Sequence, residues 1–332
     1  MNKMKKYFLL PILTSILFLT SCSDQLERFP VDQLVDETAF QTVSDLQNGV
    51  NSVLGGLNID DVVQFNAAFT DNTIQGKDSG GQALAIINQR LTPDQANVGF
   101  WVDRYNTLNR INRVLAAADR ITPSANDQVA YNNIRGILLA LRGQIHSDLL
   151  IYHSFDIKDR NSLGVVYQNF VQTDGKGERN TTGEVLDLIE QDFTEATPLI
   201  TSTDINFPTR DFITFQRARN ALWTGNYGDA VTFANAIIAK YPLADAQQYS
   251  DMFNNDADAT EVIWKYDNVQ GSNNNVAGNF RFTASVEDSN FISISQGFFA
   301  EIDPNDVRFG VLVAPDGGLP RKNKRDFQSC FL

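Results

Sequence analysis

Apolar residues recur every three or four positions over much of the first 240 residues, a spacing that predicts amphipathic helices. The pattern is clearest at 44–57, 101–119 and 127–153, where each segment has one apolar stripe. The first of these begins with a capping box that runs from Ser44 to Gln47. The second and third follow each other after a short break, so we expect them to form an antiparallel helical hairpin.

A second capping box, from Thr181 to Glu184, predicts the start of a further helix. Another helical pair is expected at 209–224 and 229–240. Beyond this pair the pattern weakens, and 261–266 alternates between apolar and polar residues like a short strand. We therefore predict a mainly α chain with tetratricopeptide-like helical hairpins, loop-rich segments and a few short strands.

The last helical pair has the spacing of a tetratricopeptide unit. Gly225 marks the turn, Ala230 lies where the two helices would touch, and Pro242 follows the second helix. Leu222 and Trp223 are then expected to fill the groove between the helices. A generic helical hairpin fits the same residues, because a single degenerate repeat carries little information.

The N-terminus has the pattern of a bacterial lipoprotein signal peptide. Three lysines among the first six residues precede an apolar stretch at 8–19, which is too short to span a bilayer. The stretch ends in Leu19-Thr20-Ser21-Cys22, in which a branched apolar residue and two small residues precede a cysteine. We therefore expect residues 1–21 to be removed and Cys22 to carry lipid, which anchors the chain to a membrane.

The composition disfavours several classes of function. The chain has 27 basic and 40 acidic residues and a formal net charge of −13, which opposes binding to nucleic acid. It has two His and two Cys, with none of the usual spacings of a zinc site. We interpret His146 and His153 as residues of helix packing and capping. The sequence contains no nucleophile elbow or phosphate-binding loop, so we predict neither an enzyme nor a bound metal or cofactor.

A series of short motifs after the lipid-attachment motif carries a family resemblance. In chain order these motifs are Phe29-Pro30, Phe40, Trp101 with Tyr105, Ile111-Asn112-Arg113-Val114-Leu115, Ala140-Leu141-Arg142, Asp148-Leu149-Leu150, Gly164-Val165, Asp192-Phe193-Thr194-Glu195-Ala196, Tyr241-Pro242-Leu243, Phe253, Glu261-Val262-Ile263-Trp264 and Asp306-Val307-Arg308. No motif is specific alone. In their order and spacing, the chain resembles the SusD/RagB family of outer-membrane lipoproteins of the Bacteroidetes.

The resemblance implies a division of the chain into three parts. Residues 1–21 are the signal peptide, 22–245 a SusD-like N-terminal domain with tetratricopeptide-like helical pairs, and 246–332 the start of the C-terminal region of the family. Members of the family usually continue well past the motif at Asp306. The chain is therefore expected to be truncated at its C-terminus, and a naturally short variant is the alternative.

The resemblance also implies a function in nutrient uptake and polysaccharide utilisation. Family members are lipid-anchored at the surface of the outer membrane, bind oligosaccharides or other nutrients, and deliver them to a SusC-type TonB-dependent transporter. The implied partners are thus this transporter, a glycan or other nutrient, and the membrane through the N-terminal lipid. A tetratricopeptide-type protein-interaction lipoprotein and a non-functional truncated fragment are the alternatives.

A sugar site combines flat aromatic faces with carboxylate, amide or guanidinium groups that bind hydroxyls. The resemblance points to two polar loops, and the helical Trp101 adds an aromatic ring. The candidate ligand-binding residues are Asp71, Asn72, Gln75, Trp101, Phe280, Arg281 and Phe282. Ordinary loop polarity is the alternative reading of the two loops, and helix packing is the alternative reading of the tryptophan.

Overall fold

The computed structural model describes residues 36–307 except 58, 77–78, 82, 93–99, 174, 176, 256, 259 and 267–291. The helices of this part are α2 (Asp36–Ala39), α3 (Val43–Gly55), α4 (Asp60–Phe69), α5 (Leu84–Ile87), α6 (Phe100–Ala118), α7 (Gln128–His153), α8 (Thr182–Leu199), α9 (Arg210–Thr224), α10 (Tyr227–Ile238), α11 (Ala246–Asn254) and α13 (Gln296–Glu301). Two short strands, β1 (Thr73–Gln75) and β2 (Ile292–Ile294), complete it. The prediction of a mainly α chain with a few short strands is confirmed.

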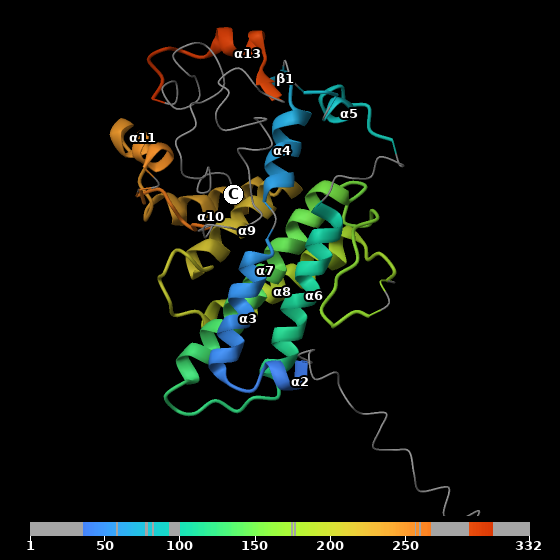
Figure 1. Ribbon diagram of the computed structural model, residues 1–332, viewed down its shortest axis with the longest axis vertical. Coiled ribbons are helices and arrows are strands. Elements are labelled where there is room, and N and C mark those ends of the chain that lie inside the picture. The colour runs from blue at the N-terminus through green and yellow to red at the C-terminus, as the bar shows by residue number, and fades with distance from the viewer. Residues whose placement is uncertain are drawn as a thin grey trace, which may run out of the picture.

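Helix α7 is the centre of the fold, in contact with α3, α6, α8 and α9 (Figure 1). Its closest neighbour is α8, which two glycines of α7 allow to approach. A Cβ atom on Gly136 would lie 2.6 Å from the Ile200 side chain, and one on Gly143 would lie 2.6 Å from the Phe193 ring. Larger residues at these positions would therefore push α8 away from the core.

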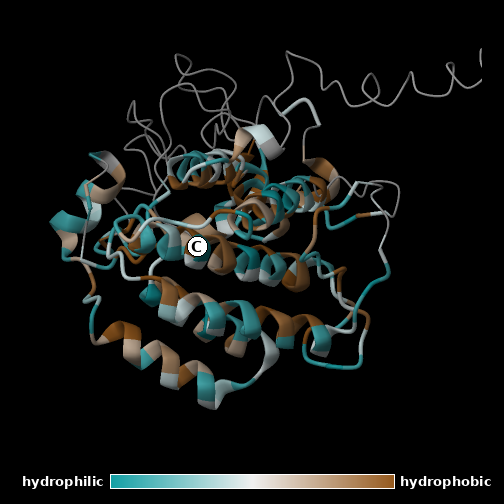
Figure 2. Ribbon diagram, turned by 90° about the horizontal axis from the view of Figure 1, so that it is seen from below, coloured by the Kyte–Doolittle hydropathy of each residue, from teal (hydrophilic) through white to brown (hydrophobic). Residues whose placement is uncertain are grey.

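The predicted helical segments form, and their apolar stripes face the core. In Figure 2 the helices carry both apolar and polar residues along their length. The apolar residues of α3, α6, α7, α8 and α9 form one buried cluster. Helices α6 and α7 make the expected hairpin. The second capping box is confirmed, because the Thr181 hydroxyl accepts the Glu184 N–H while the Glu184 carboxylate accepts the Thr181 N–H. None of the helices in the described part has the length and apolarity needed to cross a bilayer.

The first capping box lies two residues earlier than predicted. The Thr42 hydroxyl accepts the Asp45 N–H at 3.2 Å, and the Asp45 carboxylate accepts the Thr42 N–H at 2.8 Å. The predicted box from Ser44 to Gln47 is wrong because Ser44 already has helical backbone, whereas Thr42 has the extended backbone of an N-cap. The aspartate at the third helical position replaces the usual Glu or Gln.

Helices α9 and α10 form the expected pair, but two of its residues are misplaced by the prediction. Gly225 ends α9 with a φ of 80°, a left-handed value that favours glycine. Ala230 is buried in α10, as the tetratricopeptide spacing requires. Leu222 and Trp223 are exposed instead of filling the groove. They belong to the outer side of α9, because the buried stripe of this helix runs through residues such as Phe212.

The segment at 261–266 is not a strand, in contrast to the prediction from its alternating pattern. It has no regular secondary structure and packs against the helices. The Lys265 N–H donates to the Ile205 carbonyl at 2.8 Å, and the Tyr266 hydroxyl donates to the Leu54 carbonyl at 2.8 Å. Alternation in this segment reflects which side chains touch the core, without a neighbouring strand to pair with in the described part of the chain.

One end of the molecule gathers elements that are far apart in sequence. Strand β1 pairs antiparallel with β2, and Thr73 lies opposite Ile294. Helices α4 and α5 and the start of α13 lie at the same end, above α6 and α7 in Figure 1. This short pairing therefore joins the segment after α4 to residues near the end of the described chain.

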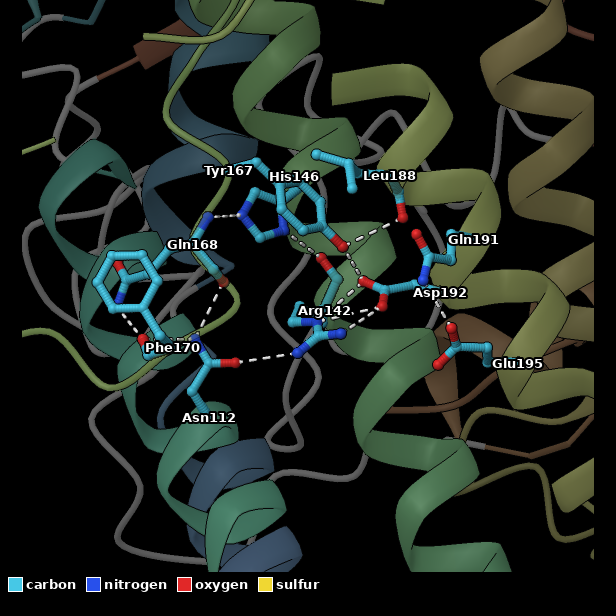
Figure 3. Close-up of polar contacts among 10 residues, drawn as sticks. All are labelled: Asn112, Arg142, His146, Tyr167, Gln168, Phe170, Leu188, Gln191, Asp192 and Glu195. Atoms are coloured by element: carbon cyan, nitrogen blue, oxygen red, sulfur yellow. Dashed lines mark hydrogen bonds and ion pairs between the residues drawn. The ribbon is translucent and has the colours of Figure 1, made fainter. Parts of the chain in front are cut away.

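A buried ion pair connects α7 to α8 (Figure 3). The Arg142 guanidinium donates to both oxygens of Asp192, with Nη2–Oδ1 at 2.6 Å and Nε–Oδ2 at 3.0 Å. Arg142 also donates to Asn112 of α6 at 3.2 Å, and the Tyr167 hydroxyl donates to Asp192. Each charged group is thus bound by several partners, the condition under which a buried pair is tolerated.

His146 lies beside this pair and binds the backbone at Gln168, in the segment between α7 and α8. Its Nε2 accepts the Gln168 N–H at 2.9 Å, so its single proton is on Nδ1, which donates to the Arg142 carbonyl at 2.9 Å. The imidazole stacks on Tyr167 with ring centres 4.0 Å apart. Burial lowers the pKa of His146 to about 3. The interpretation of this histidine as a packing residue is confirmed.

A second buried carboxylate joins α7 to α6 and α9. Asp148 is bound by Arg219 at 2.7 Å and lies 3.6 Å from the buried Arg104. The Gln144 amide donates to the same carboxylate at 3.0 Å. Helix α7 therefore presents the cation Arg142 to α8 and the anion Asp148 to the arginines of α6 and α9.

The burial of Ala230 predicts that a larger side chain destabilises the α9–α10 pair. Ala230→Leu overpacks this contact and should lower the free energy of unfolding by ~1–3 kcal/mol. The matched control is Ala236→Leu, because Ala236 is exposed on the same helix. Thermal melts by circular dichroism should show a lower midpoint for the first variant alone. Equal midpoints in the two variants would contradict the placement of Ala230.

The geometry of His146 predicts a specific dependence of stability on pH. The unfolded state binds a proton on His146 below about pH 6.5, whereas the folded state does not until about pH 3. The stability contributed by the neutral ring is thus present above pH 6.5 and is lost as the pH falls. At pH 5 the loss amounts to ~2 kcal/mol.

Urea unfolding of the wild type and of His146→Gln at pH 7 and pH 5 measures this loss. The glutamine oxygen can accept the Gln168 N–H but cannot be protonated. Because the carboxylates titrate in both proteins, the difference in unfolding free energy isolates His146. The advantage of the wild type should shrink by ~2 kcal/mol between the two pH values. A constant difference would show that the histidine is not held neutral.

Candidate functional site

The turn from α4 into β1 carries two of the candidate ligand residues. Helix α4 ends at Phe69, and its C-cap Thr70 has extended backbone. Asp71 and Asn72 follow with exposed side chains. We call residues 69–72 the α4–β1 corner. It presents a carboxylate and an amide to solvent, groups that bind hydroxyls as acceptor and donor.

Hydrogen bonds from three directions hold the backbone of the corner and of the residues that flank it. The Thr73 hydroxyl donates to the Ala67 carbonyl at 2.5 Å. The Gln89 amide, beyond α5, donates to the Phe69 carbonyl at 3.2 Å. The Ser295 N–H, at the start of α13, donates to the Asn72 carbonyl at 2.8 Å. The corner is therefore fixed by its own helix and by two segments that are distant in sequence.

Gln75 lies at the end of β1, opposite Ile292 of β2. Its side chain is half-buried, and its Nε2 is enclosed without a hydrogen-bond partner in the described part of the structure. An enclosed donor with no partner costs about 1–3 kcal/mol. A ligand hydroxyl or a water molecule that reached this amide would recover part of that cost.

Trp101 lies in the first turn of α6 and is half-buried against the helical core. Its ring contacts Tyr105 at 4.9 Å and meets His153 edge-on at 4.8 Å between ring centres. Burial lowers the pKa of His153 to about 4, with a further effect from nearby Arg179. Two sides of the tryptophan are thus occupied by neutral rings, and its role as a ligand residue stays a prediction.

A chain of ring contacts joins Trp101 to the corner. Phe69 stacks on Phe65, which meets the edge of Phe100, and Phe100 contacts His153 beside Trp101. The structure therefore places Asp71, Asn72 and Gln75 together at the corner and β1. Trp101 lies at the other end of this chain of rings.

The remaining candidates cannot be placed. Cys22, the predicted lipid-attachment residue, and Phe280, Arg281 and Phe282 of the second loop lie outside the described residues. Within the described residues, no group of three or more His, Cys, Asp or Glu side chains could hold a metal ion. Those residues therefore provide no metal site for the corner.

The sequence prediction missed Phe69 and Gln89, the residues that complete the corner. A signal for the first was present: Asp60 and Asp61 precede Val62, Phe65 and Phe69 in a short helical pattern with acidic residues in the first turn. For Gln89 the sequence has no signal, because a side-chain bond to a carbonyl 20 residues away depends on the folded path.

Comparison with protein families assigns this architecture. Residues 30–213, more than half of the chain, match the model of the SusD-like family described as starch-binding and associating with the outer membrane. The chain belongs to this family. The resemblance read from the sequence motifs is thereby confirmed. No curated protein sequence matches the chain.

Solved structures of SusD-like proteins have the same fold. A SusD superfamily protein from Bacteroides vulgatus has a TM-score of 0.72 at 18% identity, with 87% of this chain and 72% of that chain covered. A SusD-like carbohydrate-binding protein from the same species has a TM-score of 0.67 at 20% identity, with 82% and 61% covered. A laminarin-binding SusD-like protein has a TM-score of 0.56 at 17% identity, with 68% and 51% covered. This SusD-like chain thus spans roughly half to three-quarters of their lengths.

Proposed function

We propose that this SusD-like protein binds glycans at the α4–β1 corner and β1. The observation that carries the proposal is the exposed pair Asp71 and Asn72 on a backbone held by Gln89 and Ser295. The family description and the neighbouring structures supply the class of ligand, because they name starch, carbohydrate and laminarin. The donor and acceptor groups of the corner supply the chemistry.

A fixed corner suits a sugar ligand for an energetic reason. Each bond to a sugar hydroxyl replaces a bond to water, so its net contribution is small and is easily lost to the ordering of a mobile loop. Here the backbone is already bound to α4, to the segment after α5 and to the start of α13. Little conformational freedom of the backbone at Asp71 and Asn72 is therefore lost when a ligand binds.

The proposal extends to the cell surface. A chain with the motif Leu19-Thr20-Ser21-Cys22 is expected to be lipid-anchored, and the family is described as associating with the outer membrane. A surface lipoprotein that binds glycans without turnover needs a route for the sugar across the membrane. A SusC-type TonB-dependent transporter is the partner that provides it.

Protein binding through α9 and α10 is the second candidate function. This pair exposes Leu222, Trp223, Tyr227, Val231 and Ile238. Large exposed apolar side chains gathered on one helical pair are typical of interaction surfaces. On this reading the α4–β1 corner contributes nothing to the activity of the protein, so the glycan experiment separates the two candidates.

Removal of the two polar groups of the corner should weaken glycan binding. Asp71→Ala with Asn72→Ala removes a hydroxyl contact to a charged group, worth ~1.5–3 kcal/mol, and a contact to a neutral amide, worth ~0.5–1.5 kcal/mol, so affinity should fall by about tenfold or more. Affinity gel electrophoresis against a panel of soluble polysaccharides, starch and laminarin among them, measures the loss.

The matched control for this change is Asp204→Ala with Asn206→Ala. Both residues are exposed in the turn before α9, far along the chain from the corner. The control should bind as the wild type does. Equal binding by the corner variant and the control would show that the corner is not part of the site. If no polysaccharide slows the migration of the wild type in the gel, the protein-binding function is favoured.

Lipid attachment at Cys22 predicts where the protein is found in cells. Cys22→Ser should move the protein from the membrane fraction to the soluble fraction and abolish labelling by radioactive palmitate. The control is Cys330→Ser, since Cys330 is the only other cysteine of the chain. It should leave both results unchanged. Labelling that persists in the Cys22 variant would contradict the lipoprotein assignment.

A further inference from the structure

We infer that Phe69 is the aromatic platform on which a neutral sugar ring stacks, next to the polar groups of Asp71 and Asn72. The inference rests on the proposed glycan binding and adds to it the residue that sets ring orientation. It is carried by the exposure of Phe69, by the rings behind it and by the fixed backbone on which it stands.

The ring of Phe69 has one side supported and part of its surface free. It stacks on Phe65 with ring centres 5.1 Å apart and planes inclined by 14°. Phe69 is nevertheless 40% exposed. Because a parallel stack covers only one face of a ring, a sugar can approach the other face, where C–H groups of the sugar meet the negative π cloud.

Further rings stop the Phe65–Phe69 stack from shifting. Phe65 meets the edges of Phe100 and Tyr152, each with ring centres 6.0 Å apart. The Tyr152 hydroxyl in turn is bound to the Asn66 side chain, with Asn66 Nδ2 at 2.8 Å. The stack is thus anchored on α6 and α7, the rigid part of the fold.

The backbone of Phe69 is also held from outside its helix. Its carbonyl accepts the Gln89 amide at 3.2 Å, and Gln89 has a φ of 52°, in the left-handed region that non-glycine residues seldom adopt. Such a conformation persists where surrounding contacts determine it. Phe69, Asp71 and Asn72 therefore share one fixed frame.

Two other aromatic residues fit a platform less well. Trp101 is half-buried, and its ring is in contact with Tyr105 and His153. Phe155 is 87% exposed, but within the described residues no ring packs behind it. An unsupported side chain loses more rotamer freedom on binding than one that is already packed. Phe69 combines exposure with support.

The chemistry of the corner favours a neutral glycan. Asp71 supplies a negative acceptor and Asn72 a neutral donor and acceptor, and the chain as a whole carries a formal charge of −13. A glycan with carboxylate or sulfate groups would be repelled by both the residue and the chain. Starch and laminarin, the glycans named for the family and for one neighbour, are neutral.

Affinity gel electrophoresis of the full chain with starch and with laminarin tests this assignment. Phe69→Ala removes the ring, Phe69→Leu keeps apolar bulk without a π face, and Phe69→Trp keeps a π face. We expect the first two to weaken binding by about tenfold, which corresponds to ~1.4 kcal/mol, and the tryptophan variant to bind at least as well as the wild type. Phe155→Ala, the control for loss of an exposed phenylalanine, should bind unchanged.

The outcomes separate this inference from the proposed function. Wild type that binds neither starch nor laminarin overturns the platform for neutral glycans, and wild type that binds no polysaccharide of the wider panel overturns glycan binding as well. Wild type that binds, together with Phe69→Ala and Phe69→Leu variants that bind equally well, overturns the platform alone and leaves glycan binding intact. Loss in the alanine variant with full binding by the leucine variant also overturns it, because bulk and not the π face would then be what the ligand needs. Far-ultraviolet circular dichroism confirms that each variant keeps its helices.

Discussion

The arrangement of the helices depends on the ion pair between Arg142 and Asp192. Burial of a charged pair costs free energy of desolvation. Removal of one partner costs more, because it leaves the other charge buried and unpaired and destabilises the fold by ~3–5 kcal/mol. The pair therefore admits one register of α7 against α8, the register in which both carboxylate oxygens meet the guanidinium. The same Arg142 reaches Asn112 of α6, and Tyr167 of the following segment reaches the same carboxylate. Four parts of the chain are thus aligned by one polar contact.

This alignment is what gives the candidate site its support. Phe100 begins α6 and Tyr152 lies near the end of α7, two of the helices that this pair aligns, and both rings contact Phe65 of α4. These rings carry Phe65 and through it Phe69. Rigidity in the core is therefore transmitted to an exposed surface by ring packing, without any charged residue along the way. A protein that binds sugars without changing them gains from such a support, because a site with few contacts depends on their being in place beforehand.

The sequence predicts the parts of this fold that are local. Apolar spacing locates α3, α6, α7, α8, α9 and α10, since a helix buries the same face along its whole length. Thr181 with Glu184 marks a helix start by a pattern of four residues. Contacts between residues that are distant in sequence cannot be predicted in this way. The bond from Gln89 to Phe69 and the pairing of Thr73 with Ile294 depend on a folded path, and Leu222 faces solvent although its spacing suits a groove. Asp71 and Asn72 were found through the family resemblance, because exposed polar residues in a loop have no periodic pattern.

The pairing of β1 with β2 has a consequence for the order of folding. Its partners lie more than 200 residues apart and make only a three-residue ladder. Few hydrogen bonds are therefore available to offset the entropy that is lost when so long a loop closes. The helical core, built from nearer neighbours, folds before it. The α4–β1 corner is therefore completed after the helical core, so the scaffold forms before the candidate site that it supports.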